Sequence, residues 1–447
     1  MYSNIILIVF FVLMFYVYTI LLFKKIGIKY TIMLILSTFI TVLFTDPREL
    51  ILRDYRVSLV IIPIENIIAN FTLLEIILFP IMIAYILLSI FQKKPKINKY
   101  IKRIFHLWII FLIIIFVSIT YALNKFAVIK EFLKWLEVGI TATAIYLYIN
   151  DLEKLKNVYW FLFMSYLFWT IGIFLANLSF GTPWERIYAP IDSAIILLLP
   201  FLKKTFAKRL ILLLIPFLIL SYSRLAWFNV LLAVFFITWQ YIYRKKLITS
   251  FNVLILLVII SILIITIPSF RDIFLSRISY ILSGNYDQST NDRIAFYIAG
   301  LIAWKDNPLH GIGAGNFKSY LLKYDLNTGF KLKLEILPSN PHSTLLQVLT
   351  ELGLLGIIVF IVMVVLYFKV LVLSTKSIKF IEKIVESKEM NYYARGIGLH
   401  AISFITLLFT SYIGMIDRIL WGIYFGLVFG LFKIITQYKN SILWKNH

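Results

Sequence analysis

Cysteine is absent from the sequence, which excludes disulfide bonds, cysteine–zinc sites and thiol nucleophiles. Histidine is scarce, with 5 residues, and neither an HExxH nor a DxDxDG pattern occurs. Metal chemistry is therefore not indicated, and no cofactor is expected. Acidic residues are also few, since 22 Asp and Glu stand against 44 Lys and Arg, which gives a net charge of +22.

Charged residues make up only 15% of the chain, whereas 61% is hydrophobic and the mean hydropathy is +0.91. A soluble domain is about 45–50% apolar, so the excess apolar surface must face lipid. In a soluble protein this positive charge would suggest a nucleic acid partner. Here the basic residues gather in short loops between apolar runs, which is typical of cytoplasmic loops, and no nucleic acid partner is expected.

The apolar runs predict an all-α, polytopic membrane protein with roughly twelve to fourteen transmembrane helices, because a helix needs about 20 apolar residues to cross a bilayer. The first run lacks a basic flank and a cleavage site, so we interpret it as a retained helix. The predicted spans lie near 4–23, 29–45, 72–91, 104–123, 132–149, 158–177, 190–202, 209–222, 226–242, 251–268, 345–368, 397–415 and 419–436.

Lysine and arginine set the predicted orientation. The loop at 92–103 carries six of them and is placed in the cytoplasm. Alternation then puts the other strongly basic loops on the same side. The cytoplasmic loops are 150–157, 203–209, 243–248 and 369–396, of which the last three are the strongly basic ones. The longest external, periplasmic loop is 269–344, and a loop of this length usually has a structure or function of its own.

The external loop shows helical signals. A helix is predicted over 292–304, with Asn291 or Asp292 as its cap. A turn-rich break follows over 307–315, and a second short helix over 317–324. We divide the chain into N-terminal spans, a core that includes the loop, and a C-terminal part with a cytoplasmic loop and the last spans. These regions are 1–220, 221–368 and 369–447.

Two arginines are candidates for anion binding. Arg224 lies between two spans on the external side, where the alternative role is a snorkelling anchor. Arg293 opens the predicted loop helix, where N–H groups and a guanidinium together suit a phosphate. The alternative for Arg293 is a salt bridge with Asp292 or Asp287.

His342 is the candidate general base. Asn340 as N-cap and Pro341 at the first helical position predict a helix whose first turn holds His342. The helix dipole there favours the neutral, basic imidazole. The alternative is a polar capping residue, and His310 in the turn-rich break is a competitor. The acidic residues of the external loops form no carboxylate pair in a recognisable motif.

Several motifs follow one another in a fixed order. Ser223-Arg224 comes first, then Asn291-Asp292-Arg293 with Trp304, and then the stretches 307–317, 342–347 and 351–356. In sequence these read NPLHGIGAGNF, HSTLLQ and ELGLLG. From 221 to 356 the chain resembles the O-antigen ligase and polymerase family. Two positions depart from its pattern, since Ser343 replaces a frequent Asn and Leu225 a frequent Gly.

The resemblance implies a GT-C-like membrane glycosyltransferase of the bacterial inner membrane, with its active site facing the periplasm. Such an enzyme transfers a glycan from undecaprenyl diphosphate to a sugar hydroxyl, by inversion and without a metal. The resemblance places functional arginines at Arg224 and Arg293, which would bind the diphosphate, and a functional histidine at His342.

The acceptor stays open in the sequence. A ligase would use lipid A–core and a polymerase another lipid-linked repeat unit, and the ligase is weakly favoured. A transporter or flippase, or a non-catalytic scaffold, would also be polytopic and basic inside. A transporter would more often show charged or Gly/Pro-broken positions in mid-membrane and a repeat between halves.

Overall fold

The computed structural model describes Ile86 and residues 97–180, 191–220, 223–243, 288–323, 340–384, 388–410 and 415–445. Throughout these residues the regular structure is helical, as predicted. The helices are α5 (Lys99–Val117), η2 (Ser118–Thr120), α6 (Lys125–Tyr148), α7 (Leu152–Phe180), α8 (Ile191–Leu198), η3 (Leu199–Phe201), α9 (Thr205–Leu220), α10 (Arg224–Tyr243), α13 (Gln288–Asp306), α14 (Phe317–Lys323), α15 (Thr344–Ile384), α16 (Lys388–Thr410) and α17 (Met415–Lys445).

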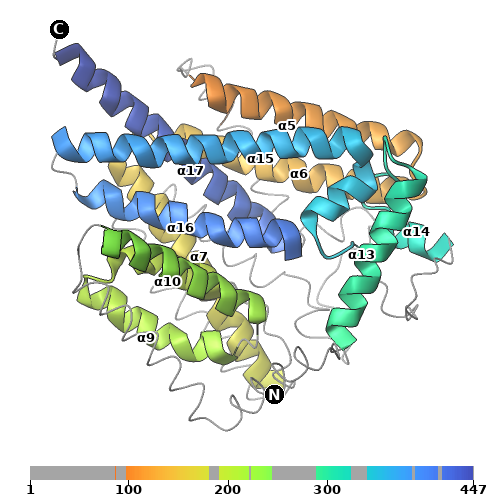
Figure 1. Cartoon of the computed structure of the whole chain (residues 1–447), viewed down its shortest axis with the longest axis horizontal. Coiled ribbons are helices and arrows are strands. Elements are labelled where there is room, and N and C mark those ends of the chain that lie inside the picture. Colours follow the sequence, from red (N-terminus) through yellow and green to blue (C-terminus); the bar gives the residue numbers. More distant parts are fainter. Residues whose placement is uncertain are drawn as a thin grey trace.

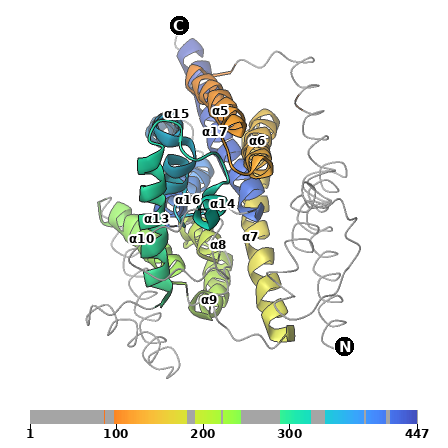
Figure 2. The same ribbon diagram turned by 90° about the vertical axis from the view of Figure 1, so that its right-hand side faces the viewer.

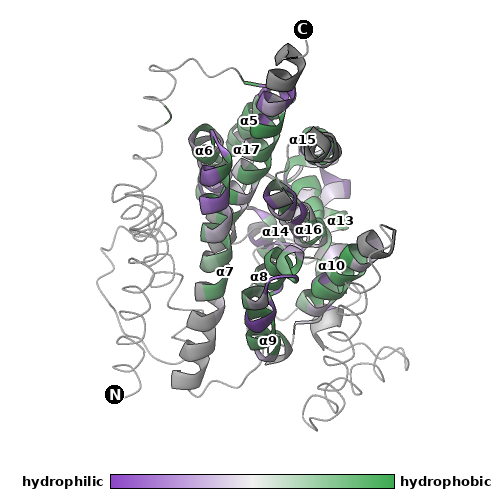
Figure 3. Cartoon of the chain, turned by 90° about the vertical axis from the view of Figure 1, so that its left-hand side faces the viewer, coloured by the Kyte–Doolittle hydropathy of each residue, from purple (hydrophilic) through white to green (hydrophobic). Residues whose placement is uncertain are grey.

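Within the described residues, three stretches are long and apolar enough to cross a membrane: Lys99–Thr120, Thr344–Thr375 and Leu420–Lys439. Together with the all-helical fold they identify a polytopic membrane protein. Figure 3 shows hydrophobic residues predominating along α5, α7 and α10. The spans predicted near 4–23, 29–45 and 251–268, and all but Ile86 of 72–91, lie outside the described residues.

The long helices form a bundle with α13 and α14 at one end. In Figure 1, α5, α15, α16 and α17 run roughly across the view, and α13 crosses their right-hand end. Figure 2 faces this end and shows α13 and α14 in front of the bundle. Both helices pack on α15. The predicted short helices of the external loop are thus confirmed as helices, and they form a layer over the bundle.

Small residues bring α6 and α17 together. Gly422, Gly426 and Gly430 recur every fourth residue along one face of α17. A Cβ at each would come within 2.5–2.6 Å of a side chain of α6 or of the residue that follows it. Close approach at a small-residue seam lets helices pack tightly where lipid offers no hydrophobic driving force.

Several predicted loops are largely helical, since α7 begins at Leu152 and α9 at Thr205, inside the loops predicted over 150–157 and 203–209. The sequence placed a basic cytoplasmic loop over 369–396, but α15 continues to Ile384 and α16 begins at Lys388. Lysines and arginines are good helix formers, so a basic stretch extends a helix beyond the bilayer as readily as it ends one. Hydropathy detects the apolar part of a helix and misses this extension.

Candidate active site

The N-terminal part of α15 contains a break at Gly353, which has φ 63° and ψ −161°. Backbone groups of the segment 308–313 fill the gap. The amides of Ile312 and Gly313 donate to the carbonyls of Thr350 and Glu351, at 3.1 and 2.9 Å. In the other direction, the amides that follow the break donate to the carbonyls of that segment: Leu354 to Pro308 at 2.9 Å and Leu355 to Leu309 at 3.2 Å. The turn therefore pairs the backbone groups that the broken helix leaves open.

Two glycines make this insertion possible. Gly311 has φ 71°, and a Cβ there would lie 2.4 Å from the carbonyl carbon of Glu351. Gly353 faces it, and a Cβ there would lie 2.4 Å from the carbonyl carbon of Leu309. Only glycine combines the left-handed conformation with so close a backbone approach. The GIGAGN and ELGLLG motifs are thus two halves of one structural joint.

The same turn is hydrogen-bonded to the connection between α5 and α6. The amide of Ala314 donates to Ser118 Oγ at 3.1 Å. Asn316 is fully buried, and its Oδ1 accepts from the amide of Asn124 at 2.6 Å. Its Nδ2 donates to the carbonyls of Asn124 and Ala314, at 3.1 and 2.9 Å. One side chain thus joins segments far apart in the sequence.

Asn316→Ala is expected to destabilise the protein by about 2–4 kcal/mol, because it removes a buried side chain and takes a hydrogen-bond partner from the backbone of Asn124 and of Ala314. The measurement is thermal unfolding of the purified protein in detergent. Asn98→Ala is the matched control: Asn98 caps α5 through the amide of Tyr100, and loss of a cap costs about 1 kcal/mol. An equal loss of thermal stability in the two variants would show that Asn316 stabilises the protein no more than an ordinary helix cap does.

His342 lies just before α15, not in its first turn as predicted. The helix begins at Thr344, and His342 adopts φ 53°. Asn340 does not cap a helix, because its Oδ1 accepts from the amide of His342 at 3.0 Å and closes a local turn. Ser343 is the cap: its Oγ accepts from the amide of Leu346 at 3.3 Å and donates to the carbonyl of Leu408 in α16 at 3.1 Å.

α13 carries Arg293 about one turn before Phe296, which contacts His342. Phe296 follows Arg293 by three residues, and its ring stacks on the His342 ring at 5.5 Å. Tyr297 lies on the same side of the helix and donates through its hydroxyl to the carbonyl of Phe409 at 3.4 Å. Burial raises the pKa of Tyr297, and the nearby charge of Arg293 opposes this shift. The Arg293 side chain is exposed.

The predicted start of this helix needs correction. α13 begins at Gln288, so neither Asn291 nor Asp292 caps it, and Arg293 lies in its second turn instead of opening it. An Asn-Asp pair before an apolar run resembles a cap, but the preceding Gln288–Thr290 continue the helix. The free N–H groups of this N-terminus therefore lie about one turn away from Arg293.

Arg224 begins α10, at the same end of the bundle. The relative positions of α8, α10 and α16 along the bundle follow from Asp192 of α8. Its carboxylate accepts from Asn229 of α10 at 2.6 Å and from Ser403 of α16 at 3.5 Å. Asn229 lies five residues after Arg224, and Ser403 lies five residues before Leu408, the partner of Ser343. At the other end of α8, Phe201 stacks on Tyr392, near the start of α16. The start of α10 and the end of α16 therefore lie at the same height along the bundle as His342. The Arg224 side chain lies outside the described residues.

Residues 210–361 match the family model described as O-Antigen ligase. This segment is an O-antigen ligase domain. It begins in α9 and ends in α15, and contains Arg224, Arg293 and His342 together with the inserted turn. No curated protein matches the chain. The domain confirms the predicted family and indicates an O-antigen ligase or polymerase type of activity, on lipid-linked glycans at a membrane.

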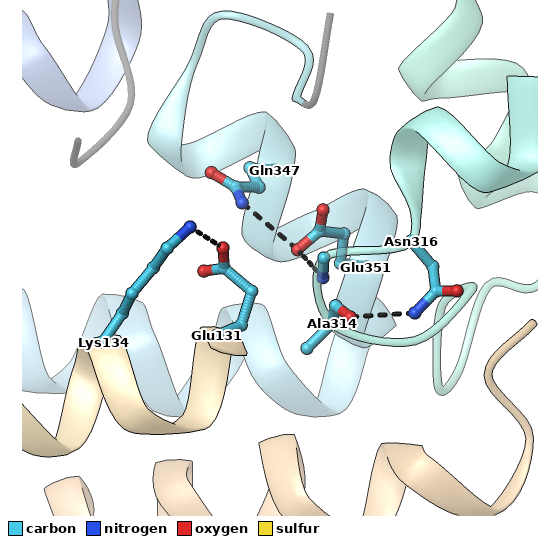
Figure 4. Close-up of polar contacts among 7 residues, drawn as sticks. Glu131, Lys134, Ala314, Asn316, Gln347 and Glu351 are labelled. Carbon is cyan, nitrogen blue, oxygen red and sulfur yellow. Dashed lines mark hydrogen bonds and ion pairs between the residues drawn. The ribbon is translucent and has the colours of Figure 1, made fainter. Parts of the chain in front are cut away.

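The O-antigen ligase domain also holds a carboxylate that the sequence reasoning missed. Glu351 is 3% exposed and lies opposite Glu131 of α6, which pairs with Lys134 (Figure 4). Acidic residues of the external loops were considered from the sequence, whereas Glu351 lies within a predicted span. Glu131, the last residue before another predicted span, was not singled out. A charged residue inside a membrane-spanning segment was the available signal.

His310, the competitor of His342, belongs to the joint of the O-antigen ligase domain. Its ring packs on Tyr121 at 4.5 Å, and the hydroxyl of Tyr121 donates to its carbonyl at 2.7 Å. Burial raises the pKa of Tyr121 to about 12, so this hydroxyl remains a donor at neutral pH. These contacts connect His310 to the turn after α5, whereas the His342 ring stacks on Phe296 of α13.

Proposed function

We propose that this protein transfers a glycan from undecaprenyl diphosphate to a sugar hydroxyl on the external face of the inner membrane, most simply as a ligase that uses lipid A–core. The observation that carries the proposal is the placement of Arg224, Arg293 and His342 at one end of the bundle, within the O-antigen ligase domain. The family match favours glycan transfer over the transporter and scaffold alternatives.

The chemistry needs charge neutralisation and one base. The acceptor hydroxyl gives its proton to the His342 imidazole, and its oxygen forms a bond to the anomeric carbon. The bond between that carbon and the diphosphate oxygen breaks, and its electron pair leaves with the lipid diphosphate. Arg224 and Arg293 stabilise the anionic leaving group, so the mechanism requires no metal. Direct displacement inverts the anomeric configuration.

Helix α15 adds to the anion site. Its N-terminus follows His342 directly, and the partial positive charge of a helix N-terminus favours a nearby phosphate. Ser343 provides the cap, so the frequent Asn of the family is replaced by a residue that still holds this helix start against α16.

Arg224→Ala and Arg293→Ala are each expected to lower the rate of glycan transfer by about 10²–10³, because each removes a charge from the leaving group. The measurement is transfer from a lipid-diphosphate glycan to acceptor by purified protein in nanodiscs, with membrane insertion checked separately. Lys305→Ala is the control, since Lys305 is an exposed cation in the last turn of the same helix as Arg293. Full activity of both arginine variants would refute the proposed site.

Deletion in the native host separates ligase from polymerase. Long lipid-linked chains that are no longer attached to core indicate a ligase, and single repeats attached to core indicate a polymerase. A host without lipopolysaccharide would refute the ligase assignment.

A further inference from the structure

The outer face of α9 carries positive charge at its start and apolar side chains directly beyond it. Ala207 and Ile211 are buried and mark the inner face of this helix. Four exposed cations, called the α9 cation cluster below, lie in its first turn and just before it: Lys203, Lys204, Lys208 and Arg209. Leu212 and Leu213 follow, with exposed fractions of 51% and 60%. The sequence contains no acidic residue from Lys203 to Leu213, so this face has no negative charge of its own.

The α9 cation cluster also lacks ion pairs with other helices in the part of the chain that the structure describes. The ion pairs found there join Lys134 to Glu131, Lys154 to Asp151 and Lys156 to Glu389. Lys204 acts on Glu389 from a distance: the hydrogen bond from Lys156 lowers the pKa of that carboxyl, and the charges of Lys156 and Lys204 lower it further. The nearest acidic group therefore already has a partner, and the counter-charge of the cluster must come from outside the described residues.

Aromatic rings support the start of α9. Phe206 is 43% exposed, and its ring lies 5.8 Å from the ring of Trp160 in α7 and 6.5 Å from that of Phe201. Phe201 in turn stacks on Tyr392 of α16 at 5.4 Å. Aromatic side chains of membrane proteins gather at the boundary between lipid tails and headgroups. We infer that the start of α9 lies at this boundary, with its cations at the height of the headgroups.

The order of side chains along α9 matches the build of a phospholipid. Lys208 and Leu212 are four residues apart and lie on the same side of the helix, about 6 Å apart along its axis at about 1.5 Å per residue. A soluble anion would use the cations and leave the leucines uncovered. An uncharged lipid would cover the leucines and leave the cations without a counter-charge. A lipid with an anionic headgroup satisfies both parts of the face.

We propose that the α9 cation cluster binds the headgroup of an anionic phospholipid, whose acyl chains lie along Leu212 and Leu213. This site goes beyond glycan transfer and does not depend on it. Phe201 and Tyr392 lie at the end of α8 opposite to Asp192, so the site is at the other end of the bundle from His342. Each basic residue near an anionic bilayer surface strengthens the attraction by about fivefold.

Quenching of a tryptophan at position 206 tests the site. Full-length Phe206→Trp protein is placed in phosphatidylcholine nanodiscs that contain brominated phosphatidylglycerol or, in parallel, brominated phosphatidylcholine. The quenching of the protein with Phe206 retained is subtracted. We expect brominated phosphatidylglycerol to quench this tryptophan at a content about fivefold lower than brominated phosphatidylcholine. Raising the ionic strength from about 0.1 M to about 1 M should remove most of this preference, because the Debye length falls from about 10 Å to about 3 Å.

The cations are tested in the Phe206→Trp protein by combining Lys203→Gln, Lys204→Gln and Lys208→Gln. We expect the two brominated lipids to quench this variant equally, because most of the charge that distinguishes them is gone. A preference that survives the three substitutions would overturn the proposal. Loss of the preference in the parent protein on addition of inorganic pyrophosphate, at constant ionic strength, would overturn it in favour of a soluble phosphate ligand.

The matched control removes as many exposed cations from the start of α5, by combining Lys99→Gln, Lys102→Gln and Arg103→Gln. The net charge of the protein then changes by the same amount, whereas the α9 cation cluster is intact. This control should keep the preference for phosphatidylglycerol at position 206. An equal loss in the control, or equal quenching by the two lipids in the parent protein, would show that α9 has no site for an anionic headgroup.

Discussion

Gly353→Ala is expected to destabilise the O-antigen ligase domain by about 3–5 kcal/mol, the largest effect on stability that the structure predicts for one added methyl group. The new Cβ would lie 2.4 Å from both the carbonyl carbon and the oxygen of Leu309, and 2.6 Å from the amide nitrogen of His310. These are backbone atoms, so no side chain can rotate away. Relief would require the segment 308–313 to leave the helix break and give up its backbone pairing.

The measurement is thermal unfolding in detergent, combined with size-exclusion chromatography to detect aggregates. Gly398→Ala is the matched control, because Gly398 is helical and the atom nearest to an added Cβ, Thr375 Cγ2, would be 3.9 Å away. Alanine in a helix is favoured over glycine by about 1 kcal/mol, so this control should melt no earlier than the wild type. A Gly353→Ala protein that melts like the wild type would show that the joint is not required for folding.

His342→Asn is expected to lower glycan transfer by about 10²–10⁴ with little change in stability. His342 holds φ 53°, and a non-glycine residue in this region is strained unless it is Asn or Asp. Asparagine therefore keeps the turn while it removes the imidazole. Strain that the fold maintains at a proposed catalytic residue is typical of a functional site.

Parallel transfer and unfolding measurements on His342→Asn, His342→Gly and His310→Asn make this test specific. Glycine should raise the melting temperature by removing the strain, yet abolish transfer as asparagine does. His310→Asn should keep most of the transfer activity, because His310 packs in the joint. Equal losses in the His310 and His342 variants would show that both histidines only maintain the fold.

The sequence predicted the parts of this protein that rest on composition and motif order. Apolar runs located the helices from α5 to α10 and from α15 to α17, and the turn-rich glycines marked the break before α14. The helix starts were less predictable, because Asn340-Pro341 and Asn291-Asp292 both resemble caps. In the first case the Asn closes a turn on itself, and in the second the helix had already begun.

The joint between the turn and α15 could not be predicted from either motif alone. Its four backbone hydrogen bonds connect segments about 40 residues apart, and each glycine is explained only by the other segment. The carboxylate pair was missed for a similar reason. Glu131 and Glu351 are far apart in the sequence, and only the packing of α6 against the turn brings them face to face.

The break in α15 has a consequence for biogenesis. The carbonyls of Thr350 and Glu351 accept from amides of the segment 308–313, which is synthesised before α15. Carbonyls without a hydrogen-bond donor are costly in free energy inside the bilayer. We therefore expect α15 to insert as a continuous helix and to break only when the segment 308–313 hydrogen-bonds to it. Pairing of the turn with α15 would then be a late step of assembly. During assembly, the amides of Ile312 and Leu354 should become protected from hydrogen exchange at the same time, and later than the amides of α17.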